Sequence, residues 1–166
     1  ESADKFETHN GNTIPSWRNF HWKSKHSSVG IELPSDIIPK TSSDSKSPIV
    51  SDSKIHTIAH VLVNASKILT KSESNDIDVY YEKGIIYLYD NSSDGYNGCS
   101  KIIYDEFDKI LNACYLLLSD CNCSDDKSQD WEGCPKCTFT TNYCQTKNKE
   151  LSKNKAIEFF AEFKQA

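Results

Sequence analysis

Hydrophobic residues recur at helical spacing in three stretches of the chain. The pattern predicts a helix that begins near Ser53, a long helix over 100–119 and a last helix over 152–164. Each helix brings its apolar residues to one face: Ile55, Ile58, Ala59, Leu62, Ala65 and Leu69 in the first, Ile103, Phe107, Ile110, Cys114, Leu117 and Leu118 in the second, and Ala156, Ile157, Phe160 and Phe163 in the third.

Other stretches have the pattern of strands. Residues 28–34 alternate apolar and polar side chains and stop at a proline, which predicts a short strand. The β-rich runs 77–81 and 85–89 flank Glu-Lys-Gly, and this arrangement is typical of a hairpin. The second run is apolar on both faces, so we expect it to lie inside the domain.

These elements predict an α+β fold, with helices around a β-hairpin or small sheet. A chain of 166 residues is long enough to bury a core as one domain. We expect that domain to cover 26–166 and to contain a Ser-rich loop near 40–53. Residues 1–25 are polar and aromatic without a clear period, and we interpret them as an N-terminal arm.

The charge of the chain limits its partners. The net charge of −5 disfavours extensive wrapping of nucleic acid by this chain alone. No apolar run approaches the roughly 18 residues of a membrane span. Lysines near the last helix could contact phosphates, but a solvated face is favoured because acidic residues precede them. These lysines are Lys147, Lys149, Lys153, Lys155 and Lys164.

The strongest chemical signal is a cluster of cysteines. Five of the seven cysteines lie between positions 121 and 144: Cys121, Cys123, Cys134, Cys137 and Cys144. Zinc prefers four soft ligands in a tetrahedron, and a Cys-Pro-x-Cys turn can direct two thiolates at one ion. We predict that Cys121, Cys123, Cys134 and Cys137 bind one Zn²⁺, with Cys144 as the substitute ligand.

An all-cysteine site is normally closed, so we expect a structural ion rather than a catalytic one. Two disulfides are the alternative for an exported protein, but the Cys134–Cys137 spacing would strain such a bond. An iron–sulfur cluster is a further alternative that the spacing leaves open. The clustering therefore favours a metal protein of the reducing cytoplasm.

Several other residues could carry chemistry, but a structural role is favoured for each. His56 and His60 are four apart on one helix, but Thr57 stands where a metalloprotease motif needs Glu. We therefore interpret them as hydrogen-bonding residues on the boundary of the helix. Cys99 lies at a helix start and could be a nucleophile, although a buried thiol is favoured. Cys114 belongs to the core stripe.

The glycine-containing loop 90–98 joins a strand to a helix, a position where backbone amides can bind phosphate. It lacks the P-loop pattern, and Asp90 and Asp94 would repel an anion. We therefore predict a structural turn. Because no Walker lysine occurs in the chain, we expect no ATP hydrolysis by this chain alone, and we identify no catalytic residue.

Taken together, these segments resemble a known family. The order of the motifs is similar to the C-terminal zinc-binding domain of the mitomycin-repair helicases, superfamily 2 DNA helicases related to the RecQ-like Hrq helicases. The resemblance covers roughly 26–164. It is carried by 55–62 (Ile-His-Thr-Ile-Ala-His-Val-Leu), 85–91 (Ile-Ile-Tyr-Leu-Tyr-Asp-Asn), the glycine loop and helix, Cys121-Asn-Cys123, 133–137 (Gly-Cys-Pro-Lys-Cys), Cys144 and 151–156 (Leu-Ser-Lys-Asn-Lys-Ala).

The resemblance implies a zinc held by cysteines and a non-catalytic accessory role beside a helicase motor, in DNA repair or defence. The motor would lie on the same chain or on a partner, and any DNA contact would be made through the complex. The sequence departs from the family pattern at two places. The loop reads Asp94-Gly-Tyr-Asn-Gly98 instead of Pro-Gly-Gly-x-Gly, and ten residues separate Cys123 from Cys134, where the family often has only a few. The alternative function is a stand-alone, zinc-stabilised adaptor for another protein.

Overall fold

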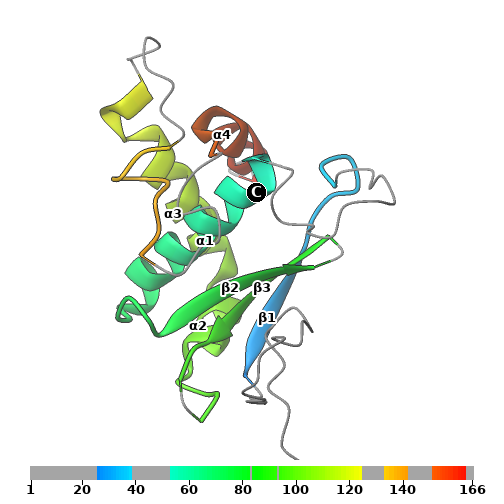
Figure 1. Cartoon of the computed structure of the whole chain (residues 1–166), viewed down its shortest axis with the longest axis vertical. Coiled ribbons are helices and arrows are strands. Elements are labelled where there is room, and N and C mark those ends of the chain that lie inside the picture. Colours follow the sequence, from blue (N-terminus) through cyan, green and yellow to red (C-terminus); the bar gives the residue numbers. More distant parts are fainter. Residues whose placement is uncertain are drawn as a thin grey trace, which may run out of the picture.

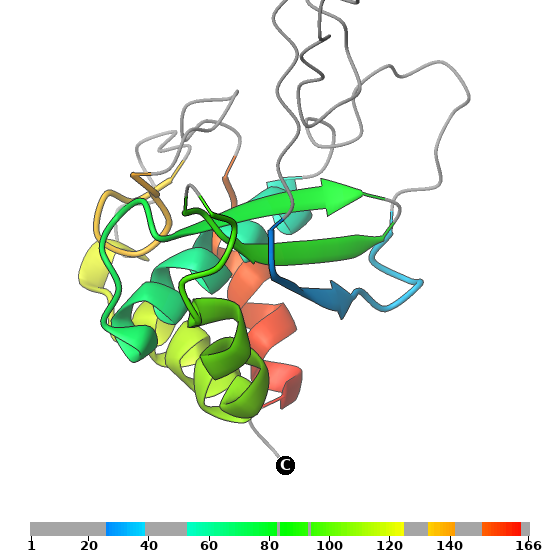
Figure 2. The ribbon, with the colours of Figure 1, turned by 90° about the horizontal axis from the view of Figure 1, so that it is seen from below.

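In the part of the chain that the structure describes, three antiparallel strands form a sheet with four helices on one side of it (Figures 1 and 2). The computed structural model describes residues 26–38, 53–82, 84–92, 94–124, 133–141 and 151–163. The predicted α+β class is confirmed, with the cysteine segment between the last two helices. The arm 1–25, most of the Ser-rich loop and Cys144 lie outside the described residues.

The central strand of the sheet is the one with apolar side chains on both faces. The strands are β1 (Ser28–Glu32), β2 (Ile77–Glu82) and β3 (Ile85–Asp90), in the order β1-β3-β2. Leu88 pairs with Val29 of β1 and with Val79 of β2, and its side chain is fully buried. The prediction that this run lies inside the domain is therefore confirmed.

Helix α1 (Ser53–Thr70) lies between the sheet and the other long helices. It packs against β2, α3 (Phe107–Ser119) and α4 (Lys153–Glu162). This position buries residues around nearly the whole circumference of α1: Ile55, His56, Thr57, Ile58, Ala59, His60, Val61, Leu62, Val63, Ala65 and Ser66. The one-sided helix suggested by the apolar spacing is thus a central core helix.

The long helix predicted over 100–119 is divided into two. Helix α2 (Cys99–Asp105) ends before Glu106, whose backbone leaves the helical conformation at φ −117° and ψ 26°, and α3 starts at the next residue. The break has a packing reason: both helices contact α1, but α2 also contacts β1 and β3 whereas α3 also contacts α4. One straight helix would have to contact both sets of neighbours along a single axis.

Helix α4 differs from its expected pattern at one end. Ala156 and Phe160 are fully buried, as expected, and Phe159 is also buried. Phe163 was expected to point inward but is 40% exposed, because it follows the last residue of the helix and contacts Phe159 at the edge of the core. Among the helices that the structure describes, none has the length and apolar character needed to cross a membrane.

The loop between β3 and α2 is organised by one buried carboxylate. Asp90 is completely buried and accepts hydrogen bonds from the backbone N–H groups of Ser100 at 2.6 Å and of Asn97 and Gly98 at 3.0 Å. These amides at the start of α2 would otherwise need another acceptor. The loop is therefore a structural turn, as predicted, whose amides are bonded to an anion from the chain itself.

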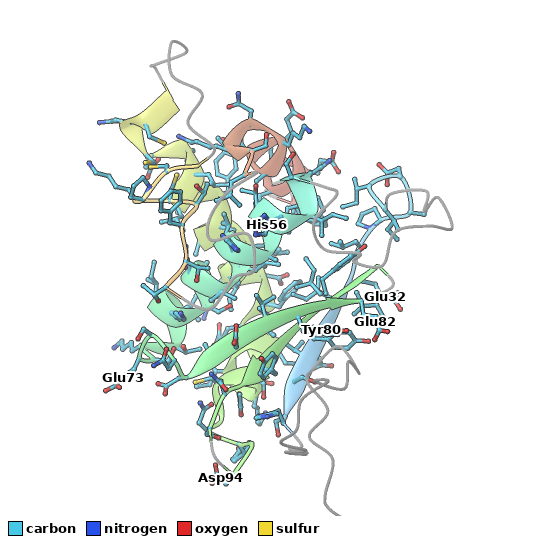
Figure 3. All side chains as sticks on the ribbon, viewed as in Figure 1. Glu32, His56, Glu73, Tyr80, Glu82 and Asp94 are labelled. Carbon is cyan, nitrogen blue, oxygen red and sulfur yellow. The ribbon has the colours of Figure 1, made fainter. Side chains whose placement is uncertain are left out.

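Replacing this carboxylate should destabilise the fold. In Asp90→Asn the side chain loses its charge and one acceptor oxygen, so we expect the free energy of unfolding to fall by about 2–4 kcal/mol. Urea denaturation of the zinc-loaded protein measures this loss. Asp94→Asn is the matched control, since Asp94 is exposed at the outer end of the same loop (Figure 3). Equal stability of Asp90→Asn and the wild-type protein would contradict the assigned role.

Candidate metal centre

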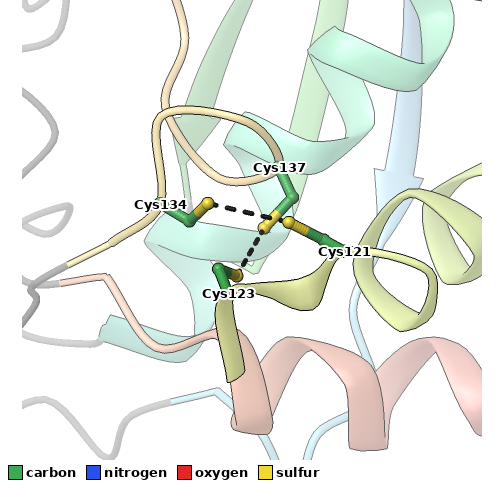
Figure 4. A group of neighbouring side chains, drawn as sticks. All are labelled: Cys121, Cys123, Cys134 and Cys137. Carbon is green, nitrogen blue, oxygen red and sulfur yellow. Dashed lines mark hydrogen bonds between the residues drawn. The ribbon is translucent and has the colours of Figure 1, made fainter. Parts of the chain in front are cut away.

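Four cysteine sulfurs meet at the end of α3. Cys121 follows the helix, Cys123 lies in the short 3₁₀ turn Asn122–Ser124, and Cys134 and Cys137 come from the Cys-Pro-x-Cys turn. Their Sγ atoms all lie within 4.8 Å of one another. The Sγ atoms of Cys121 and Cys134 are 3.7 Å apart, and those of Cys123 and Cys137 are 3.6 Å apart (Figure 4). The four sulfurs thus surround a single point.

This geometry fits one zinc ion. With Zn–S bonds of about 2.3 Å, the sulfurs of a regular tetrahedron are about 3.8 Å apart. The two measured separations are close to that value, whereas a disulfide requires a separation near 2.05 Å. The described cysteines are free thiols. The disulfide alternative therefore does not describe this cluster, and the donor set suits a closed tetrahedral site.

The Cys-Pro-x-Cys turn is held in shape by its own backbone. The carbonyl of Cys134 accepts N–H groups from Thr138 at 3.0 Å and Phe139 at 2.9 Å. The hydroxyl of buried Thr138 accepts the N–H of Cys134 at 2.6 Å. The N–H of Lys136 donates to the sulfur of Cys134 at 3.3 Å. The turn therefore directs both of its sulfurs inward while satisfying its buried amides.

Side chains of α1 fix the turn to the rest of the domain. Nδ1 of His60 lies 3.0 Å from the carbonyl oxygen of Thr138, and a bond there requires that Nδ1 carry the proton. Nδ2 of Asn64 donates to the carbonyl of Phe139 at 2.7 Å. His56 packs edge-on against His60, with 4.3 Å between the ring centroids. The histidine pair thus has the structural role that we favoured, although both rings are buried rather than at the helix boundary.

The crowding of the four sulfurs makes full ionisation unfavourable without a cation. Burial raises the pKa of Cys137 well above its usual range, and the nearby sulfurs of Cys123 and Cys121 raise it further. Burial also raises the pKa of Cys134, but the N–H of Lys136 and the other polar contacts lower it more, to about 7. A divalent ion at the centre would supply the positive charge that four adjacent thiolates need.

One charged residue near the sulfurs makes a contact that the sequence did not predict. Nζ of Lys153, the first residue of α4, lies 3.3 Å from Sγ of Cys123 and donates to the carbonyl of Cys121 at 2.7 Å. The solvated-face interpretation is therefore wrong for Lys153. Lys155 instead contacts the hydroxyl of Ser53 at 3.2 Å. Lys147, Lys149 and Lys164 lie outside the described residues.

Comparison with known proteins agrees with this geometry. The family model for the MrfA Zn-binding domain matches residues 58–138, a segment that includes all four clustered cysteines. An uncharacterized protein of Methanocaldococcus jannaschii, MJ1572.1, is 31% identical over 113 residues, which cover 62% of this chain and 93% of that protein. The chain belongs to the MrfA Zn-binding domain family. The resemblance noted from the motifs is thereby confirmed, as is the expected cofactor, one structural zinc ion.

A solved structure is also similar to part of this chain. The crystal structure of the DUF1998 helicase MrfA bound to DNA aligns with a TM-score of 0.48 and 23% sequence identity. The alignment covers 66% of this chain. It covers 13% of the helicase chain.

The two described cysteines outside the cluster have structural surroundings. Cys99 is buried, and this burial, together with the carboxylate of Asp90, raises the pKa of its thiol. A reactive thiol would need a lowered pKa, so the buried interpretation is favoured over the nucleophile. Cys114 is fully buried in the core, with its sulfur 3.8 Å from the carbonyl oxygen of Val61.

The hydroxyl of Thr138 offers a test of how the turn is built. Thr138→Val keeps the side-chain shape but leaves the N–H of Cys134 without its acceptor, so we expect a loss of about 1–3 kcal/mol in the free energy of unfolding. Thr138→Ser retains the hydroxyl and is the matched control. Urea denaturation in the presence of zinc compares the two variants. A larger loss in Thr138→Ser would show that the methyl group, not the hydroxyl, supports the turn.

Proposed function

We propose that Cys121, Cys123, Cys134 and Cys137 bind one structural Zn²⁺ in a non-catalytic accessory domain of an ATP-dependent DNA helicase. The observation that carries the proposal is the meeting of four sulfurs within 4.8 Å in a chain of the MrfA Zn-binding domain family. The sulfur separations suit a tetrahedral ion, and the four ligands would leave no open coordination position for a substrate.

The role of the metal would be to cross-link the chain. When bound, zinc supplies four strong bonds between the end of α3 and the Cys-Pro-x-Cys turn. His60 and Asn64 already connect that turn to α1, and Lys153 connects α4 to the Cys121–Cys123 segment. The site would therefore join three helices in a region where the Cys-Pro-x-Cys turn has few apolar side chains of its own.

The link to a helicase is supported by the family to which the chain belongs. We propose that a superfamily 2 motor, on the same chain or on a partner, supplies ATP hydrolysis and translocation in DNA repair or defence. This domain would support DNA binding or unwinding within the complex, since the chain's net charge of −5 disfavours strong DNA binding by the chain alone. We propose 26–166 as the domain, 1–25 as an arm, and the reducing cytoplasm as the compartment.

A stand-alone adaptor is the second candidate, favoured by exposed apolar side chains around α2. Tyr104 is 72% exposed, Tyr96 58% and Ile102 42%. Large exposed aromatic and aliphatic residues are common in protein interfaces. Such residues could contact either a helicase motor or an unrelated protein, so their exposure does not distinguish the two candidates. The candidates differ in whether helicase activity depends on this domain.

Metal analysis of single-cysteine variants tests the ligand set. We expect one zinc per wild-type chain with four sulfur ligands by X-ray absorption. Alanine at any of the four clustered positions should leave an incomplete tetrahedron that loses its zinc to a chelator. Cys144→Ala is the matched control and should retain the ion. Zinc retained by Cys123→Ala but lost by Cys144→Ala would show that Cys144, and not Cys123, is the fourth ligand.

The helicase role can be tested with the motor that the proposal requires. The full-length helicase, or the motor reconstituted with this chain, should unwind a forked DNA duplex more slowly when Cys134 and Cys137 are both replaced by alanine. The reason is that the metal-free turn no longer joins α3 to α1. Cys144→Ala provides the control, and strand separation measured by fluorescence gives the rate. Equal unwinding with and without the domain would favour the adaptor.

A further inference from the structure

The most exposed of the four sulfur ligands has a positive charge beside it. Cys134 and Cys137 are buried and Cys121 is partly buried, whereas Cys123 is exposed. Water, acid and competing chelators therefore reach the Cys123 sulfur first. Nζ of Lys153 lies 3.3 Å from this sulfur. The lysine thus contacts the ligand at which loss of a metal ion would begin.

We propose that Lys153 is a positioning residue of the metal centre, whose ammonium group bonds the Cys123 sulfur and slows loss of the ion. This inference rests on the proposed zinc site. Four thiolates around a divalent ion carry a net charge of −2, and a charge-assisted N–H···S bond withdraws electron density from the sulfur. A sulfur with less electron density is less readily protonated and is a weaker nucleophile toward a competing electrophile or metal.

The fold holds the ammonium group in place. Lys153 is the first residue of α4, and the N–H of the preceding Ser152 donates to the hydroxyl of Thr57 on α1 at 2.7 Å. One turn further, Ala156 is fully buried, as is Phe160 beyond it. A second bond from Nζ to the carbonyl of Cys121, at 2.7 Å, limits the direction of the side chain. The packing of α4 thus fixes the backbone of Lys153, and the bond to the Cys121 carbonyl helps to hold its ammonium group beside Cys123.

The contact between Lys153 and Cys123 also connects the metal-binding segment to the start of α4. The Cys121–Cys123 segment belongs to the connection that follows α3, while Lys153 belongs to α4, and these helices also pack against each other. Once the ion is lost and the thiolates take up protons, the net negative charge that Lys153 faces would disappear. The start of α4 would then lose one of its polar contacts with the metal segment. Residues outside the first ligand shell commonly affect metal affinity in this way.

Transfer of zinc to a chromophoric chelator tests the proposal. In Lys153→Met we expect zinc affinity to fall, and the release rate to rise, by about 10-fold to 100-fold, the range typical of lost outer-shell contacts. Lys153→Arg restores a cationic N–H donor and should recover most of the wild-type rate. Lys155→Met is the matched control from the same helix, since Lys155 contacts Ser53 rather than a cysteine.

Cobalt substitution separates a bond to sulfur from a general effect on helix packing. Without the N–H···S bond the sulfur holds its electrons less tightly, so the sulfur-to-cobalt charge-transfer band of Lys153→Met should move to longer wavelength. The band should be unchanged in Lys155→Met. A wild-type release rate in Lys153→Met, or faster release with an unmoved band, would overturn the inference. A wild-type chain that binds no zinc would instead refute the proposed site itself.

Discussion

The contact between α1 and the Cys-Pro-x-Cys turn is the interaction on which the metal centre depends. The turn has little apolar surface, and its carbonyl groups at Thr138 and Phe139 are bonded by His60 and Asn64. These side chains come from a helix whose position is set by the sheet on one side and by α3 and α4 on the other. The apolar core therefore fixes the position of α1. The polar side chains of α1 in turn fix the turn that carries the sulfurs of Cys134 and Cys137.

This dependence explains why the most buried helix of the domain carries polar residues. Thr57 and His60 are nearly or completely buried, a costly environment for polar groups that lack partners. Thr57 accepts the N–H of Ser152 before α4, and His60 bonds the metal turn. The helix thus combines two functions: its apolar residues form the core, and its polar residues connect two chain segments that the core alone would not order.

Much of this arrangement could be predicted from the sequence, because it depends on local patterns. Spacing of apolar residues located the helices and the hairpin, and the two-sided apolar run identified the central strand. The four clustered cysteines were selected by the Cys-Pro-x-Cys spacing, although their role as ligands stays a proposal. The helix break at Glu106 and the exposure of Phe163 depend on which neighbours each residue meets, and apolar periodicity carries no information about those neighbours. The roles of His60 and Lys153 depend on contacts between residues 78 and 30 positions apart.

The buried carboxylate of Asp90 has a consequence for nucleotide chemistry. The strand–loop–helix junction presents converging backbone amides, the same donors with which many proteins bind the phosphates of ATP. Here Asp90 already accepts three of those N–H groups. An incoming phosphate would have to expel this side chain and overcome its negative charge. A carboxylate of the chain itself therefore closes these three amides to a phosphate group.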